Sequence, residues 1–280
     1  MKVAPRRNIL CPGEGKPMAR KTTFALLGDV HGYMHPTVAL LERVQRKMKI
    51  SLDFALQVGD FEPHRHEEDL RSMSAPSKYK QLGDYADFYN GRAHFPCPVY
   101  FIGGNHEPYG WLEQYPEGFT LSPQCHYLGR TSSMHMQDID LRVGGLTGIF
   151  EDEVFTHARP SVELIDHISN KEFITFREHD VDAMLALPKP DVLLVHDWPE
   201  GLSAGVSRQG SAGNAYTRLL VDLLEPKLVA CGHMHHAYEE IIEHPSGKQT
   251  RVVCLGHITQ RSDAIAIMQW DGAQFTRLDA

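Results

Sequence analysis

Short apolar runs that end in glycine or polar residues recur along the chain. Three lie in the first half: TTFALLGDVHG at 22–32, LDFALQVGD at 52–60 and CPVYFIGGNHE at 97–107. Two more lie in the second half: DVLLVHDWP at 191–199 and KLVACGHMHH at 227–236. Apolar runs of this length, bounded by turn residues, are typical of buried strands. We therefore predict five buried strands, each followed by a loop.

Segments with helical spacing lie between these runs. Pro36 opens a predicted helix that ends near Lys47, because apolar residues recur there every three or four positions. Residues 65–92 are polar and are expected to be mostly helical. Further helices are predicted over residues 178–187 and 212–226, the second of which ends at a proline.

The remaining segments predict shorter strands and one long loop. Residues 134–145 have the pattern of a hairpin that turns at Asp138. Residues 151–178 are polar and irregular, and a loop of this length in a compact domain is usually functional or mobile. Three further short strands are predicted at 238–244, 250–255 and 263–270.

The alternation of strands and helices indicates an α/β fold with a layered sheet. A length of 280 residues would allow about two domains. Neither a repeat nor a linker divides the chain, so we predict a single domain over residues 21–280. Residues 1–20, rich in proline, glycine and basic residues, are expected to form a flexible N-terminal extension.

Composition narrows the class of protein. The chain is 42% hydrophobic and 23% charged, which is ordinary for a soluble globular protein. Its 28 basic and 36 acidic residues give a net charge of −8, which argues against a basic protein that coats nucleic acid. No apolar run reaches the roughly 20 residues of a membrane span. The five cysteines are irregularly spaced and predict no disulfide framework, so we expect a cytoplasmic protein.

The predicted strand ends carry side chains of the types that bind metals. They are Asp29, His31, Asp60, Asn105, His196, His233 and His235. Ligands of open α/β sheets bind beyond the carboxyl ends of the strands, so these side chains are expected to converge. Side chains two apart on an extended segment point the same way, so Asp29 with His31, and likewise the last two histidines, can approach one site from one side.

Seven ligands are too many for one ion. Two adjacent ions that share a bridging carboxylate would use them all, and such centres clamp an in-line displacement at phosphorus. The two aspartates offset only half the charge of two divalent ions, which leaves room for a hydroxide and a phosphate. A single such motif is more often a surface accident or a hydrogen-bonded core histidine. Five in order, each after an apolar strand, favour a metal site.

In this order, the motifs D-x-H, GD, GNHE, H and GH-x-H resemble those of the calcineurin-like metallophosphoesterases. The resemblance covers about residues 22–240. It implies a four-layer αββα metallophosphoesterase sandwich, in which two sheets lie between layers of helices. It also implies a hydrolase acting on ester bonds with two divalent metal ions as cofactors, either Mn, Fe or Zn.

A narrower resemblance is to the catalytic domain of the RNA lariat debranching enzymes, which cleave the 2′–5′ phosphodiester of an intron branch point. It rests on residues 59–91 and on FIGGNHE, HYLGR, RVGGLTGIF and HDWP. The chain departs from that family at three places. Asp29 stands where those enzymes carry Cys, residues 151–178 match their branch-recognition loop weakly, and their additional C-terminal domain is expected to be absent.

The wider resemblance implies a role for each site residue. One ion is expected on Asp29, His31 and His235, the other on Asn105, His196 and His233, with Asp60 bridging them. A hydroxide held between the ions would attack phosphorus. His106 is the candidate general acid for the leaving oxygen, and Glu107 is expected to orient a histidine ligand.

Further residues are candidates for substrate contacts. Trp198, beside a predicted ligand, could stack on a base, and it could equally lie in the core. Arg159, Lys171 and Arg177 of the long loop could contact phosphates, although solvated surface charge is the alternative for each.

We therefore predict a debranching-enzyme-like phosphodiesterase that acts on a phosphate ester, either RNA or a nucleotide. No membrane and no obligate protein partner are expected. One alternative is a general nucleotide or cyclic-nucleotide phosphoesterase. Another, from a different class, is a metal-binding protein-interaction scaffold without activity. A phosphoprotein phosphatase is disfavoured, because Phe61-Glu62-Pro63 stands where that family has Asp-Arg-Gly.

Overall fold

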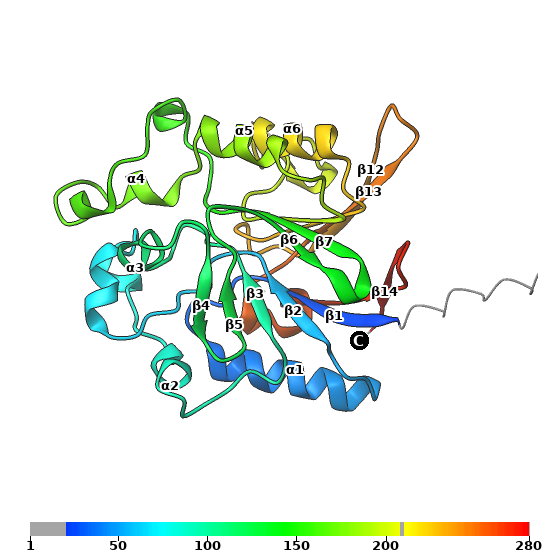
Figure 1. Ribbon diagram of the computed structural model, residues 1–280, viewed down its shortest axis with the longest axis horizontal. Helices are drawn as coiled ribbons and strands as arrows, with labels where there is room; N and C mark the ends of the chain where they lie inside the picture. Colours follow the sequence, from blue (N-terminus) through cyan, green and yellow to red (C-terminus); the bar gives the residue numbers. More distant parts are fainter. Residues whose placement is uncertain (1–20, 208–209, 280) are drawn as a thin grey trace, which may run out of the picture.

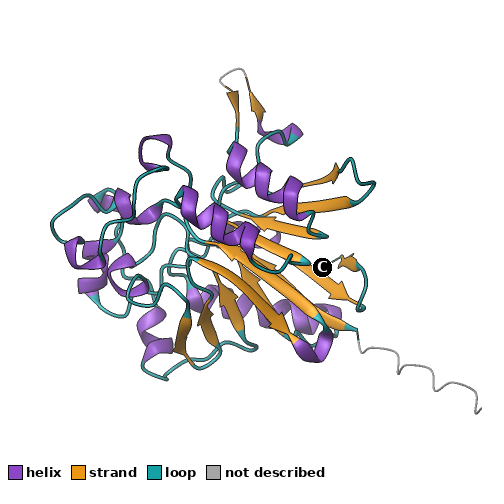
Figure 2. Cartoon of the chain, turned by 45° about the horizontal axis from the view of Figure 1, so that its top comes forward, coloured by secondary structure: helices purple, strands orange, loops and turns teal. Residues whose placement is uncertain are grey.

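Four layers make up the computed structural model, which describes residues 21–207 and 210–279. Two β-sheets pack face to face, and helices cover their outer faces (Figures 1 and 2). This arrangement confirms the predicted αββα sandwich. The prediction for residues 1–20 lies outside the described residues.

The first sheet has seven strands, with parallel strands at its centre. Their spatial order is β15 (Phe275–Leu278), β14 (Ile265–Trp270), β1 (Thr22–Leu27), β2 (Phe54–Gln57), β3 (Val99–Phe101), β5 (Cys125–Tyr127) and β4 (Phe119–Ser122). Strands β1, β2 and β3 are the first three buried strands predicted. Strands β4, β5 and β15 were not predicted.

The second sheet has six strands. Their spatial order is β12 (Tyr238–Glu243), β13 (Gln249–Cys254), β11 (Leu228–Cys231), β8 (Val192–Val195), β7 (Leu141–Leu146) and β6 (Thr131–Met136). Strands β13, β11, β8 and β7 are parallel, while β6 and β7 form the predicted hairpin. A separate pair comprises β9 (Val206–Ser207) and β10 (Gly210–Ser211).

Three helices cover the sheets. Helix α1 (Met34–Met48) lies on the first sheet, and α5 (Glu178–Ala186) and α6 (Ala215–Leu224) lie on the second (Figure 1). Shorter helices are α2 (Tyr85–Tyr89), α3 (Tyr109–Leu112) and α4 (Lys171–Ile174). Short 3-10 segments occupy Glu67–Ser72, Ser77–Tyr79, Gln137–Ile139, Asp152–Val154, Val162–Leu164, Ser203–Gly205 and Ile258–Ala264. No helix of the described segments is long and apolar enough to cross a membrane.

Two helix predictions need correction. Helix α1 begins at Met34 rather than at Pro36, because the Asp84 carboxylate accepts hydrogen bonds from the backbone N–H groups of Met34 and His35 at 2.6 and 3.0 Å. Residues 65–92 do not form a mostly helical segment: two 3-10 segments and the short helix α2 are separated by loop, because Pro76 and Gly83, whose φ is 66°, interrupt the helical pattern.

The apolar residues form three layers that hold the sheets and helices together. Alternate side chains of β1 face opposite ways: Phe24 and Leu26 pack between the two sheets, while Ala25 and Leu27 pack toward α1. Strands buried on both faces read as continuous apolar runs, which is why the five strands could be predicted. The carboxyl ends of β1, β2 and β3 in one sheet therefore lie opposite those of β8 and β11 in the other.

Candidate metal centre

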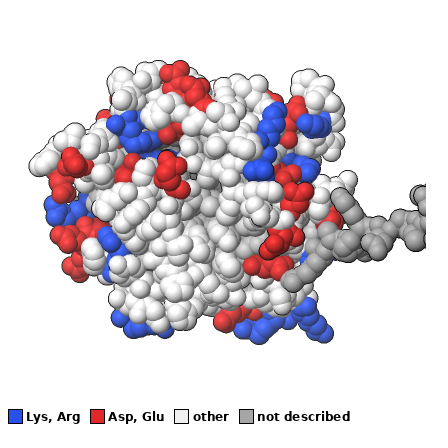
Figure 3. Space-filling view, viewed as in Figure 1, with Lys and Arg blue, Asp and Glu red and all other residues white. Residues whose placement is uncertain are grey.

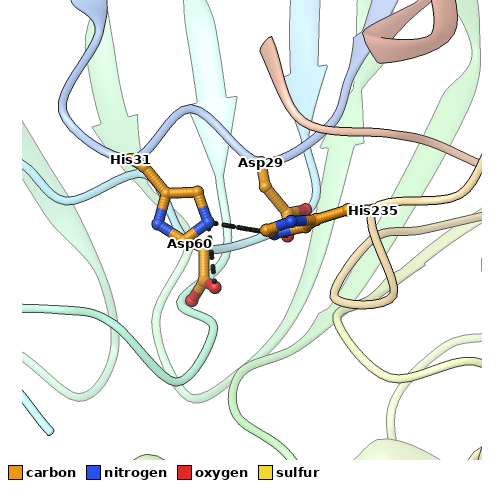
Figure 4. Close-up of side chains that lie close together, drawn as sticks. All are labelled: Asp29, His31, Asp60 and His235. Atoms are coloured by element: carbon orange, nitrogen blue, oxygen red, sulfur yellow. Dashed lines mark hydrogen bonds and ion pairs between the residues drawn. The ribbon is translucent and has the colours of Figure 1, made fainter. Parts of the chain in front are cut away.

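The loops that follow these five strands bring two groups of potential metal ligands together. Within each group the ligand atoms lie within 4.8 Å of one another. The first group is Asp29, His31, Asp60 and His235, and the second is Asp60, His196 and His233. Figure 4 shows the first group, with residues from both sheets facing one another. Asp60 belongs to both groups, so its carboxylate lies between them.

Asn105 lies beside the second group. Its side-chain oxygen is 3.2 Å from Nε2 of His196, and His196 Nε2 is 3.4 Å from an Asp60 oxygen. All seven residues predicted as ligands are thus brought to one place. Imidazole nitrogens with carboxylate and amide oxygens form a donor set that suits divalent ions such as Zn and Mn. The residues therefore fit a divalent metal site.

Left-handed backbone turns, rather than extended segments, point these side chains inward. Strand β1 already ends at Leu27 and β11 at Cys231, so the argument from extended pairs was wrong about the local conformation. The residues with positive φ include His31 (47°), Asp60 (53°), Glu62 (56°), His233 (65°) and His235 (49°). Such conformations are costly for residues other than glycine and cluster at functional sites.

Two glycines leave room for the site. A Cβ on Gly104 would lie 2.6 Å from His196 Nε2 and would also clash with the carboxylate of Asp60. A Cβ on Gly232 would overlap an oxygen of Asp29. Only glycine allows the backbone to come this close to the side chains of the site.

Hydrogen bonds orient two of the histidines. His196 is fully buried, and its Nδ1 lies 2.8 Å from the carbonyl oxygen of Val58. His31 Nδ1 lies 2.6 Å from Oε1 of Glu62. An imidazole that donates from Nδ1 presents Nε2 as a lone-pair donor, which is how ligating histidines are held. Sequence reasoning did not predict this role of Glu62, although the residue follows the GD motif directly after Phe61.

Buried carboxylates make the site favourable for positive charge. Burial acts to lower the pKa of His31, but the hydrogen bond to Glu62 and the charge of Asp60 outweigh it and raise the pKa to about 9. For His196, burial likewise acts to lower the pKa, but the charge of Asp60 outweighs it and raises the pKa to about 10. Burial acts to raise the pKa of Asp60, yet the two histidines hold it well below its usual range. A bound cation would displace protons from these groups.

His106 lies beside the two groups without belonging to either. Its backbone N–H donates to an Asp60 oxygen at 2.8 Å, and its ring centroid is 5.4 Å from that of His31. Burial lowers its pKa, and the charge of Asp60 opposes this only in part. The imidazole therefore lies beside the site as a side chain that neither group of ligand atoms uses.

Glu107 does not orient a histidine, which corrects the prediction. Its carboxylate is fully buried and accepts hydrogen bonds from the backbone N–H groups of Phe61, Glu62 and Gly104 at 2.8, 2.9 and 3.2 Å. Burial and the charge of Asp60 raise its pKa to about 8, while these donors act in the opposite direction. Glu107 thus ties the loop after β2 to the loop after β3.

Three of the four predicted substrate contacts are largely buried. Arg177 is fully buried and donates to the carbonyl oxygens of Val154 and Glu172 at 2.5 and 2.8 Å. Arg159 donates to Asp180 and has only 11% of its side chain exposed. Trp198 is 2% exposed. In this structure these three side chains hold the fold together, because their polar or aromatic groups face protein; Lys171 is exposed at the start of α4.

Replacing Arg177 by Met is expected to lower the free energy of unfolding by about 3 kcal/mol, because the loss of this buried guanidinium leaves the carbonyl oxygens of Val154 and Glu172 without their donor. Urea denaturation of the purified protein measures this. Arg92→Met, a change at a side chain that is 61% exposed, is the matched control. Full stability of Arg177→Met combined with weaker substrate binding would restore the predicted substrate contact.

Replacing Glu62 by Gln is expected to weaken metal binding by about 10- to 100-fold, because the carboxylate fixes the orientation of His31. Isothermal titration calorimetry with the metal measures the change in affinity, and Glu67→Gln on the exposed surface is the control. Unchanged metal affinity in Glu62→Gln would show that this hydrogen bond does not position the ligand.

Two further residues near the site were not predicted. The ring of His257, in the segment after β13, stacks on His31 with centroids 4.8 Å apart. The Asp197 carboxylate accepts hydrogen bonds from Phe150 and Asn214 and lies 3.8 Å from His233 Nε2. The position of Asp197 directly after a predicted ligand was the only sequence signal for either residue.

Known proteins are similar to this chain in sequence and in fold. Residues 22–237 match the family model of the calcineurin-like phosphoesterases. The chain belongs to this family, and the predicted class, a metal-dependent phosphoesterase, is thereby confirmed. Among solved structures, TT1561 of Thermus thermophilus superposes with a TM-score of 0.53 at 14% identity, over 92% of this chain and 98% of that one. At this identity the likeness shows the fold alone.

Curated relatives carry the name lariat debranching enzyme. The protein from Schizosaccharomyces pombe is 30% identical over 234 residues, which are 78% of this chain and 50% of the relative. The protein from Caenorhabditis elegans is 28% identical over 249 residues, 80% of this chain and 49% of the relative. The predicted similarity to debranching enzymes is confirmed. The chain spans about half the length of the curated relatives it matches.

Proposed function

We propose that this chain is a phosphodiesterase that holds two divalent metal ions and cleaves a phosphodiester of RNA. The observation that carries the proposal is the position of the Asp60 carboxylate, which is common to two groups of ligand atoms and accepts the N–H of His106. When bound, the ions would supply Lewis-acid chemistry that acidifies a water and neutralises charge on the phosphate oxygens.

The two groups of ligand atoms indicate which residues would hold each ion. Asp29, His31 and His235 would hold one ion, and Asn105, His196 and His233 the other, with Asp60 shared. Mixed nitrogen and oxygen donors accept Mn, Fe or Zn. A scaffold without activity would not need every one of these groups, together with His106, to face one centre.

The chain's own residues would position and protonate the substrate. His106 would give a proton to the leaving oxygen, because its imidazole lies beside the centre and is not needed as a ligand. Asp60 keeps the backbone of His106 in place through the 2.8 Å hydrogen bond. Glu107 would hold the two loops at a constant separation through its three N–H donors.

Two classes of substrate are supported by different features of the chain. Similarity to debranching enzymes over most of this chain supports a 2′–5′ phosphodiester of RNA. Asp29, which stands where the resemblance places Cys, favours a more general nucleotide or cyclic-nucleotide phosphodiesterase, since its carboxylate is 3.0 Å from His235 Nε2 and adds a negative charge to the site. A cytoplasmic location also remains a proposal, and the free state of Cys97, Cys125, Cys231 and Cys254 supports it.

Hydrolysis of a branched 2′–5′ RNA, a linear 3′–5′ RNA and bis-p-nitrophenyl phosphate, each with added Mn²⁺, tests the proposal. Cleavage selective for the branch supports the debranching activity. Cleavage of the small diester without preference for the branch supports the general phosphodiesterase. No turnover of any of the three substrates at full metal occupancy would contradict both activities and would favour the metal-binding scaffold without activity.

A further inference from the structure

A groove follows helix α1 away from the metal centre. It lies between α1 and the chain that runs from the 3-10 turn Ile258–Ala264 into β14 and β15. Two hollows of about 550 and 460 Å³ make up the groove, and they share Leu40, Arg43 and Arg261 in their walls. Because they share three lining residues, the two hollows adjoin each other along α1.

The groove begins next to the metal centre. Its near wall contains Thr259, whose hydroxyl oxygen is 2.7 Å from Nδ1 of His257. The ring of His257 in turn stacks on His31, one of the proposed ligands. From Pro36 at the near end to Lys47 at the far end, α1 rises about 16 Å. The groove therefore leads away from the place where a scissile phosphate would be held.

Unpaired cations line this path. Arg43, Lys47 and Arg261 are exposed, and none of their side chains forms an ion pair or hydrogen bond with another described residue. Arg261 has φ 53° and ψ −89°, so its backbone is held in a rarely adopted conformation at the junction of the two hollows. In Figure 3, Lys and Arg side chains gather at the lower edge of the molecule, where Figure 1 places the C-terminal half of α1.

The remaining charges of the groove do not cancel these three. Arg277 also lines it but is engaged with Glu239. Two carboxylates, Asp263 and Asp279, face the same hollow, and Asp263 accepts a hydrogen bond from the hydroxyl of Ser262 at 3.3 Å. The groove is thus locally cationic in a chain whose net charge is −8. A cationic path with low-dielectric walls attracts an extended anion.

We infer that this groove binds the phosphate backbone of a single-stranded nucleic acid whose scissile phosphodiester lies at the metal centre. The inference rests on the proposed function. A strand places phosphates at regular intervals on both sides of the bond that is cut, which suits several cations along one path. No aromatic ring is among the described residues that line the groove, so binding through base stacking is not expected. The contact would be independent of base sequence.

Binding without turnover tests the groove directly. The full chain, kept free of metal by EDTA, is titrated into a fluorescein-labelled single-stranded RNA of mixed sequence, and fluorescence anisotropy is followed at several KCl concentrations. The variant Arg43→Gln/Lys47→Gln/Arg261→Gln is expected to bind at least tenfold more weakly. Its plot of log affinity against log salt should be less steep by about 2, since each neutralised phosphate of a single strand contributes about 0.7.

A matched triple variant, Arg92→Gln/Lys189→Gln/Lys248→Gln, removes the same charge from cations that already have partners. It should bind the RNA within twofold of the unchanged chain. Equal losses in both triple variants would overturn the groove in favour of a general charge effect. Binding to phosphatidylserine vesicles but not to RNA would also overturn it. Thermal melting checks that each variant is folded. The single change Lys47→Glu should also weaken RNA binding, by less than the triple groove variant does.

Kinetics separate this inference from the proposed function. With Mn²⁺ present, the groove variant should raise KM for an RNA substrate and leave hydrolysis of bis-p-nitrophenyl phosphate unchanged, because the small diester does not reach the groove. Failure of the unchanged chain, with full metal occupancy, to cleave the branched RNA, the linear RNA and the small diester would contradict the proposed activity while the binding result stands. Unaltered RNA binding by the groove variant would contradict the groove, whatever the activity.

Discussion

Replacing Asp60 by Asn is expected to remove nearly all of the phosphodiesterase activity together with metal binding. The Asp60 carboxylate is common to both groups of ligand atoms, and an amide there removes the negative charge that both ions would share. Loss of several kcal/mol of transition-state stabilisation corresponds to a fall of about a thousandfold in kcat/KM. Metal content by plasma emission spectrometry, measured on the same sample as turnover, checks both parts.

Asp138→Asn is the matched control for this change, since Asp138 is an exposed carboxylate in the hairpin between β6 and β7. It should keep both the metal and the activity. An Asp60→Asn protein that retained two ions for each chain would show that this carboxylate is not the shared ligand.

Replacing His106 by Ala should instead separate catalysis from metal binding. His106 contacts the site through its backbone N–H and its ring faces His31, but it belongs to neither group of ligand atoms. Loss of a general acid typically lowers kcat by about 10²- to 10⁴-fold. The metal content and the thermal stability should stay near those of the unchanged protein, because the backbone hydrogen bond to Asp60 persists.

The choice of leaving group sharpens this test. A substrate with a p-nitrophenol leaving group needs little protonation, so His106→Ala should impair it far less than an RNA substrate whose leaving group is an alcohol. His94→Ala, a change at an exposed histidine, is the control. Equal losses on both substrates would assign His106 to charge neutralisation rather than to proton donation.

The positions of the seven proposed ligands could be predicted because they depend on strand order alone. An apolar strand followed by a short polar loop places its last residues at the edge of a sheet. Residues such as Asp60 and His196 need no other information than the strands that precede them. Glu62 and His257 lie at the same centre through contacts between segments far apart in sequence, and no local pattern encodes such contacts.

The burial of side chains in the long loop could not be predicted from the sequence. Arg159 and Arg177 were candidates for phosphate contacts because they lie in a long polar loop, with solvated surface charge as the alternative. Both guanidinium groups instead donate to protein acceptors. A polar loop can hold itself in place by burying its own arginines, and the sequence does not distinguish these arginines from exposed ones. The left-handed turns at His31 and His233 were also unpredictable, since non-glycine residues rarely adopt them.

The centre draws its proposed ligands from both sheets, and this has a consequence for stability. Asp29 and Asp60 follow strands of one sheet and His196 and His233 follow strands of the other. Ions bound there would cross-link two halves of the molecule that otherwise meet mainly through apolar packing. Truncation of a buried side chain between the sheets, such as Leu194, should therefore weaken metal affinity at a distance. Removal of the metal by a chelator should in turn loosen the packing between the sheets. Both effects follow because metal binding and the packing of the two sheets would be linked in one folding equilibrium.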